Sequence, residues 1–193
     1  KQLTKWFWQS IFARRYTSGI TEKHKNDLRE MQKLKNNPNY EFANYDFQFS
    51  EKYFLENKFS LSSVNSKVFI LQLAQKNPKS FISGANVDLE KVLKLVNRNE
   101  FHHIFPVKHL ERNGIDKNEI NSLTNICFLN NADNQKIKDK SPSEYYKLIP
   151  QSTVDELLKL AICPKDTFDL TYIDFTNKRA TLLYENAKTL MEL

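Results

Sequence analysis

The sequence predicts a mainly helical α+β fold that contains one small unit of two strands followed by a helix. Gly occurs only 3 times in 193 residues, whereas Leu, Lys and Glu are frequent, a composition typical of helices rather than of β-sandwiches. Apolar residues recur at helical spacing over most of the chain. Two apolar runs between residues 101 and 129 are instead short and interrupted, which is typical of buried strands.

The N-terminal segment is predicted to form two helices. Leu3 to Tyr16 carries an apolar face rich in aromatic residues, opposite Lys and Arg, and Thr17-Ser18-Gly19 is expected to end this helix with Gly19 as its C-cap. Thr21 is then expected to cap a second helix over about residues 22–35. Asn36-Asn37-Pro38-Asn39 should end the second helix.

The next part of the chain gives a mixed pattern. Residues 40–60 are ambiguous and suggest short helical turns. Val64 to Lys76 predicts a buried helix that stops at Asn77-Pro78. Residues 79–98 predict a loop followed by a short helix from Asp88.

The central unit follows. Phe101–Pro106 and Leu123–Leu129 are predicted strands joined by a long loop, and Asn125 lies inside the second run. Asn131 to Asp139 predicts a short helix that stops before Ser141-Pro142, because the residue before proline disfavours helical geometry. Beyond it we expect two short helices, at 143–148 and 153–160, and one long helix over about the last 20 residues.

Composition narrows the class of protein. Lys and Arg number 29 against 23 Asp and Glu, and the net charge of +6 favours an anionic partner such as nucleic acid. Cys127 and Cys163 lack metal-site spacing and are interpreted as buried free thiols of a cytoplasmic protein. No apolar run reaches the roughly 18 residues of a membrane span. Because Lys1 opens directly into a helical pattern, we expect a piece of a longer protein.

The adjacent pair His102-His103 is the strongest chemical signal. Side chains alternate along a strand, so the two imidazoles should point in opposite directions. One can bind a divalent cation that stabilises charge on a phosphoryl group. The other can accept a proton from water, because a neutral imidazole has a pKa near 6.5. The pair therefore suits hydrolysis of a phosphodiester bond.

The order of motifs resembles a known family. The chain has His102-His103-Ile104-Phe105-Pro106, Asn125 with Leu129, Asn134, and Lys140-Ser141-Pro142-Ser143-Glu144-Tyr145. This order resembles the HNH endonucleases and most closely the HNH domain at the C-terminus of GmrSD-type modification-dependent restriction endonucleases. The resemblance is specific over residues 99–146 and general elsewhere. It implies a mainly α protein with a small ββα-metal (HNH) core.

The resemblance also assigns roles to individual residues. It implies that His102 is the first metal ligand, His103 the general base and Asn134 the second metal ligand. Asn125 would hold the loop between the strands so that His103 stays oriented. An Asn in place of a second ligating His favours one Mg²⁺ ion, with Mn²⁺ as the other candidate.

Two lysines complete the expected site. Lys136 and Lys138 lie where the helix would meet DNA phosphates. The sequence does not decide whether Glu100 and His109 belong to the site or lie on the surface. The loop from His103 to Asn125 is longer than in minimal family members, and its tip is a candidate insertion.

The implied function is DNA cleavage in a modification-dependent restriction or phage-defence system. The family's upstream ParB-like nucleotide-hydrolysing domain is missing from this sequence. We expect one compact domain with a helical surround at 1–98, the nuclease core at 99–146 and C-terminal helices at 147–193. Two alternatives stay open: a DNA-binding or assembly module whose degenerate HNH site does not cleave, and a nuclease that acts on RNA.

Overall fold

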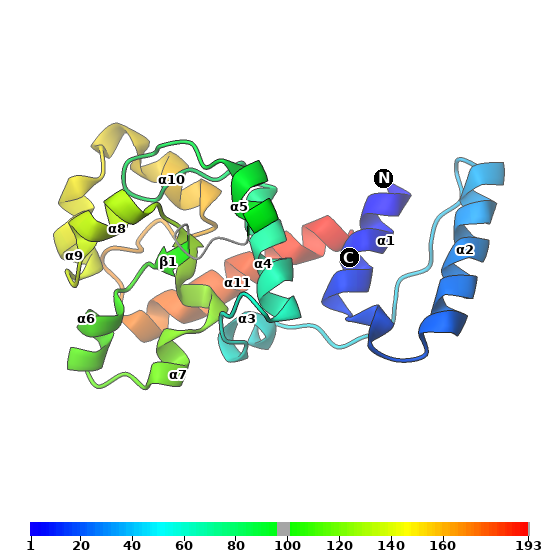
Figure 1. Ribbon diagram of the computed structural model, residues 1–193, viewed down its shortest axis with the longest axis horizontal. Coiled ribbons are helices and arrows are strands. Elements are labelled where there is room, and N and C mark those ends of the chain that lie inside the picture. The colour runs from blue at the N-terminus through cyan, green and yellow to red at the C-terminus, as the bar shows by residue number, and fades with distance from the viewer. Residues whose placement is uncertain (96–100, 193) are drawn as a thin grey trace. The chain divides into compact units, whose positions relative to one another are not determined.

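The computed structural model describes residues 1–95 and 101–192 and has the expected mainly helical α+β character (Figure 1). Its contacts divide the chain into two compact units, Lys1–Ser50 with Glu185–Leu193, and Glu51–Tyr184. The expected segments 1–98, 99–146 and 147–193 followed motifs rather than packing, and they stay a prediction. The C-terminal helix contributes residues 172–184 to one unit and 185–191 to the other.

The secondary structure is dominated by helices. These are α1 (Gln2–Phe12), α2 (Ile20–Asn36), α3 (Lys52–Glu56), α4 (Val64–Ala74), α5 (Leu89–Leu95), α6 (Val107–Arg112), α7 (Lys117–Ile120), α8 (Asn131–Ile137), α9 (Pro142–Tyr145), α10 (Val154–Leu160) and α11 (Tyr172–Met191). The strands are β1 (Phe101–His103) and β2 (Ile126–Phe128). Within the described ranges, no helix combines the length and apolar character needed to cross a membrane.

The first unit packs around the aromatic face of α1. Trp8 and Phe12 are buried, and the Phe12 ring lies 4.9 Å from that of Phe49, centroid to centroid. Gln9 is also buried and donates a hydrogen bond of 3.0 Å to the carbonyl oxygen of Met191. The aromatic pattern of the sequence therefore does mark a core helix.

The junction between α1 and α2 differs from the prediction. The chain turns after α1 at Arg14, whose backbone is left-handed (φ 48°), so Gly19 does not cap α1. Gly19 (φ 60°) instead directly precedes α2, and Thr21 lies inside that helix. The Arg15 guanidinium lies 2.7 Å from the buried Asp27 carboxylate of α2. This ion pair, rather than a capping motif, fixes the junction.

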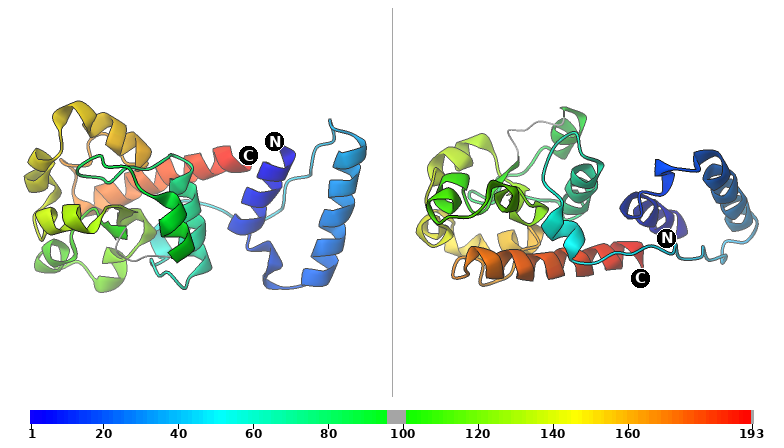
Figure 2. Two further views of the ribbon diagram at one scale, coloured as in Figure 1. Left: turned by 45° about the horizontal axis from the view of Figure 1, so that its top comes forward. Right: turned by 90° about the horizontal axis from the view of Figure 1, so that it is seen from below.

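In the second unit α11 supports the other elements from one side (Figure 2). Phe175, Ala180 and Leu183 of this helix are fully buried, as their helical spacing predicted. The ring of Phe175 lies 4.8 Å from that of Phe105, centroid to centroid, which brings α11 under the segment that follows β1. The buried Cys127 and Cys163 are free thiols, as predicted, and burial raises the pKa of each.

The two strands form an antiparallel pair, and α8 follows the second strand. His102 lies opposite Cys127, and His103 lies opposite Ile126. Both strands are shorter than predicted. Residues 123–125 form a 3₁₀ turn (η3, Leu123–Asn125), so Asn125 precedes β2 instead of lying within it, because its side chain bonds to loop backbone. The predicted long loop contains α6 and α7.

Candidate active site

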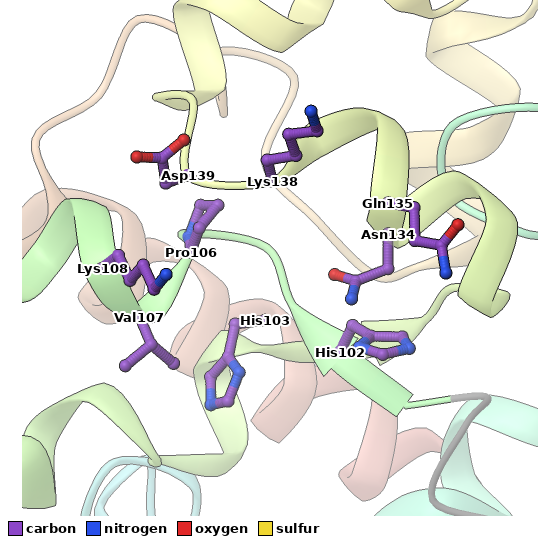
Figure 3. Close-up of a pocket in the computed structure, with 9 residues that line it drawn as sticks. All are labelled: His102, His103, Pro106, Val107, Lys108, Asn134, Gln135, Lys138 and Asp139. Carbon is purple, nitrogen blue, oxygen red and sulfur yellow. The ribbon is translucent and has the colours of Figure 1, made fainter.

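A pocket of about 520 Å³ opens where β1 ends beside α8 (Figure 3). It brings together His102, His103, Asn134 and Lys138 of the predicted site, whereas Asn125 and Lys136 do not line it. The remaining lining residues are Pro106, Val107, Lys108, Gln135 and Asp139. Two parts of the chain that are separate in sequence, residues 102–108 and 134–139, therefore meet at one surface.

The strand β1 delivers both histidines. Each is half-buried, and the alternation of side chains along the strand separates the two rings. In Figure 3 the Asn134 amide projects from α8 on the side where His102 lies, and the His103 ring extends away from α8. His102 therefore lies near the Asn134 amide, whereas the His103 ring faces a different part of the pocket.

The start of α8, which positions Asn134, is anchored by a buried carboxylate that sequence reasoning missed. Asp133 accepts hydrogen bonds from Ser80 Oγ (2.6 Å) and Ser83 N (3.1 Å). The Asn130 side chain caps the helix by accepting from Asp133 N at 2.8 Å. Burial alone would raise the pKa of Asp133, but the hydrogen bonds from the serines hold it below its usual value. The carboxylate therefore stays ionised and ties α8 to the 80–83 segment.

The two predicted phosphate-binding lysines are placed differently. Lys136 Nζ lies 3.0 Å from the Asp133 carboxylate, outside the pocket lining. Lys138 lines the pocket, and its backbone (φ 56°, ψ −112°) adopts a conformation that favours glycine and strains other residues. Lys108, which sequence reasoning missed, also lines the pocket, so two lysines belong to its lining.

Asn125 joins both ends of the loop between the strands. Its side chain is fully buried and accepts a hydrogen bond from Phe105 N at 2.8 Å. Its amide nitrogen donates to the carbonyl oxygens of Phe105 (3.1 Å) and Ile120 (3.0 Å). Its backbone carbonyl accepts from Ile104 N at 2.8 Å. The residues directly after the histidine pair are therefore fixed by one side chain, which is the geometry that an anchoring role requires.

Replacing Asn125 with alanine should remove its three side-chain hydrogen bonds to the loop without changing any group that lines the pocket. We expect the free energy of unfolding to fall by about 2 kcal/mol, because buried backbone groups lose their partners. A crystal structure of Asn125→Ala should show the 103–106 segment displaced. An undisplaced segment would show that Asn125 does not hold the loop.

Two further buried side chains, on α9 and α11, support the sheet. Tyr145 donates a hydrogen bond of 2.8 Å to the carbonyl oxygen of Ile104. Arg179, which is fully buried, donates from Nη1 to the carbonyl oxygens of Thr124 (2.7 Å) and Ile126 (2.9 Å). Arg179 also bonds to the two carbonyls that follow α10, at residues 161 and 162. The Arg179 guanidinium thus donates to backbone carbonyl oxygens on both sides of it and links β2 to the end of α10.

The His103 imidazole has the properties of a proton acceptor. Burial, together with the neighbouring charge of His102, holds its pKa below the usual value, although the contact with Asn121 opposes that shift. Its Nε2 lies 2.9 Å from Asn121 Oδ1. A histidine with a lowered pKa is neutral at physiological pH and can take a proton from water.

Few cation-binding groups lie at this pocket. Across residues 1–95 and 101–192, no three His, Cys, Asp or Glu side chains lie close enough together to hold a metal ion. At the pocket the carboxylate of Asp139 is 3.0 Å from Arg112 Nη2. His102 and Asn134, which lie on the same side of the pocket in Figure 3, offer an imidazole nitrogen and an amide oxygen. Two neutral donors suit a weakly held, hydrated ion that also takes substrate oxygens, as Mg²⁺ does.

The sequence left the roles of two residues open, Glu100 and His109. Glu100 is outside the described residues. His109 lines a separate pocket of about 310 Å³ with apolar residues that include Phe105 and Ile173. His109 is therefore not a member of the group around His102 and His103.

Comparison with known proteins gives one informative similarity. No family model matches the sequence, and no solved structure matches it. The chain is 31% identical over 151 residues to an uncharacterized protein of Methanocaldococcus jannaschii, MJ0686. The match covers 76% of this chain and 25% of that protein, so the chain spans about a quarter of the length of the curated relative it matches. The name of the relative states no activity.

Proposed function

We propose that this chain is a DNA endonuclease domain of the ββα-metal (HNH) type. The observation that carries the proposal is the meeting of His102, His103 and Asn134 at one pocket, at the end of a strand and beside the helix that follows its partner strand. The anchoring contacts of Asn125 support the same reading, because they fix the loop that follows the histidines. The basic edge formed by Lys108 and Lys138 suits an anionic substrate.

In this proposal His103 accepts a proton from the attacking water as the water oxygen bonds to phosphorus and the bond to the leaving oxygen breaks. His102 and Asn134 would hold one divalent cation, Mg²⁺ or Mn²⁺, which stabilises charge on the phosphoryl group and on the departing oxygen. Lys108 and Lys138 bind the phosphates on either side of the scissile bond. Asn125 keeps the His103 ring oriented.

The wider role that we propose follows the resemblance described above. The domain would cleave foreign, modified DNA in a cytoplasmic restriction or phage-defence protein, and a ParB-like nucleotide-hydrolysing domain elsewhere in that protein would control it. Selectivity would then come mainly from outside this chain, because the short helix α8 offers few side chains to read bases.

A second candidate is a DNA-binding or assembly module that does not cleave. One observation favours it: at this pocket the described residues offer the cation two neutral donors and no unpaired carboxylate. Such a module would keep the basic edge and the anchored loop but would show no metal-dependent reaction.

Metal dependence separates the two candidates. The variants His102→Ala and Asn134→Ala should each weaken Mn²⁺ binding about 10-fold or more in calorimetry, and higher Mn²⁺ should partly restore cleavage. Gln135→Ala, on the same helix and at the same pocket, is the matched control that should bind Mn²⁺ normally. Unchanged affinity in both test variants would overturn the assignment of these ligands.

The strained backbone of Lys138 predicts opposite effects on stability and on binding. Lys138→Gly should raise the free energy of unfolding by about 1 kcal/mol, because glycine adopts this conformation without strain. The same change should reduce the slope of log affinity for duplex DNA against log salt by about 1, because one phosphate contact is lost.

Lys136→Ala is the matched comparison for Lys138. Its ammonium already pairs with Asp133, so its loss should change the salt slope less. A Lys138→Gly protein with an unchanged salt slope would show that this side chain does not contact DNA phosphates.

A further inference from the structure

The geometry points to Asn121 as the residue that sets the proton position on the His103 ring, so that Nε2 carries the proton and Nδ1 presents its lone pair. Asn121 directly follows α7 as its C-cap and lies outside every motif noted in the sequence. The inference rests on the proposed function for its consequence, since it makes Nδ1 the atom that takes the proton from water. The assignment of the ring proton itself can be tested without any cleavage.

The orientation of the Asn121 amide is determined by its second contact. Its Nδ2 donates a hydrogen bond of 3.1 Å to the carbonyl oxygen of Lys117. A carbonyl oxygen can only accept, so the amide nitrogen must face Lys117 and the amide oxygen must face His103. His103 Nε2, at 2.9 Å from that oxygen, must therefore be the donor.

The backbone around Asn121 makes this acceptor rigid. The carbonyl oxygen of Asn121 accepts a hydrogen bond of 2.8 Å from Phe59 N. The next residue, Ser122, pairs with Lys58 in an isolated antiparallel bridge. The α7 helix is further fixed by Tyr172, whose hydroxyl donates to the carbonyl oxygen of Glu119 at 2.7 Å. Asn121 is thus held from two sides and can orient an imidazole that lies 18 positions earlier in the sequence.

The chemical consequence follows from the two ring nitrogens. In a neutral imidazole one nitrogen donates and the other accepts, and the partner of the first decides the state of the second. With Nε2–H committed to Asn121, the lone pair is on Nδ1. Asn121 touches neither metal nor substrate in the proposed site, so it is a positioning residue.

Nuclear magnetic resonance of the ring nitrogens tests the assignment directly. Spectra recorded at about pH 8, where a histidine of ordinary or lowered pKa is neutral, should show the Nε2–H form for His103. The chain has 4 histidines, and His103→Ala identifies the resonance. In Asn121→Leu the His103 signals should shift towards the Nδ1–H form, whereas Asn121→Asp, which keeps an acceptor oxygen, should retain Nε2–H. A wild-type Nδ1–H form, or an unchanged form in Asn121→Leu, would overturn the inference.

Cleavage kinetics supply the second readout. Asn121→Leu should lower kcat about 10-fold or more, with KM for duplex DNA within about 2-fold of wild type, and Asn121→Asp should restore most of the loss. The control is Asn118→Leu on the same helix, whose side chain accepts from Lys58 and not from His103. An equal loss in the Leu and Asp variants would contradict the positioning role. If the wild type does not cleave, the proposed function fails while the spectra still decide the proton position.

Discussion

The variant His103→Ala is expected to lose cleavage by about 100-fold to 10,000-fold while it keeps the fold and the DNA affinity of the wild type. A general base acts on a proton that moves only in the transition state, so its removal lowers kcat and leaves binding nearly unchanged. Single-turnover kinetics and a binding titration on the same preparation measure both quantities. His109→Ala is the matched control, because His109 lines a different pocket.

The wild-type cleavage rate should fall on acidification only when the His103 ring becomes protonated. Because burial lowers the pKa of His103, the ring stays neutral to a lower pH than an ordinary histidine. The rate should therefore persist below about pH 6.5 and fall only as the ring becomes protonated. A His103→Ala protein that cleaves at the wild-type rate would show that His103 is not the base. A wild-type rate that already falls on acidification while the pH is still above about 7.5 would show the same.

Loss of Arg179 is expected to have the largest effect on stability. The variant Arg179→Met removes the guanidinium from four backbone carbonyl oxygens, at residues 124, 126, 161 and 162, of which those at 124, 126 and 162 belong to buried residues. Methionine fills much of the volume but donates no hydrogen bond, so the free energy of unfolding should fall by about 3 kcal/mol or more. Denaturant unfolding measures the change.

The matched control for this stability prediction is Arg112→Met. Arg112 is exposed and pairs with Asp139 at the surface, where an ion pair contributes at most about 1 kcal/mol. If Arg179→Met and Arg112→Met lose similar amounts of stability, the buried guanidinium does not support the sheet in the way described. If the Arg179→Met protein keeps the wild-type free energy of unfolding but does not cleave DNA, the side chain positions β2 without stabilising the unit.

Helical periodicity predicted most of the fold. The apolar run of α4 predicted a buried helix, the helical spacing of apolar residues predicted the buried face of α11, and both helices are present close to the predicted limits. The junction after α1 could not be predicted in the same way, because it depends on an ion pair between Arg15 and Asp27. Local sequence rules predicted Gly19 as the C-cap of the first helix, but Gly19 directly precedes the second helix.

The site was predictable where local rules apply and hidden where distant segments meet. The alternation of a strand places His102 and His103 apart, and a motif order placed Asn134 on the following helix. Lys108 lines the pocket, and Asn121 contacts His103, only because the loop between the strands folds into α6 and α7. The hydrogen bonds between Asp133 and residues 80–83 join segments about fifty positions apart, so no local sequence pattern predicts them. The Asn130 cap of the same helix is a local pattern and could have been predicted.

We propose that this pocket hydrolyses DNA with His103 and a divalent cation. The most direct measurement is the nicking of a supercoiled plasmid by the purified chain, in Mg²⁺, in Mn²⁺ and in EDTA, beside His103→Ala protein purified in parallel. We predict nicking by the wild type in either metal, none in EDTA, and at least a 100-fold lower rate for the variant. Plasmid binding without nicking in either metal, or equal nicking by both proteins, would contradict the claim.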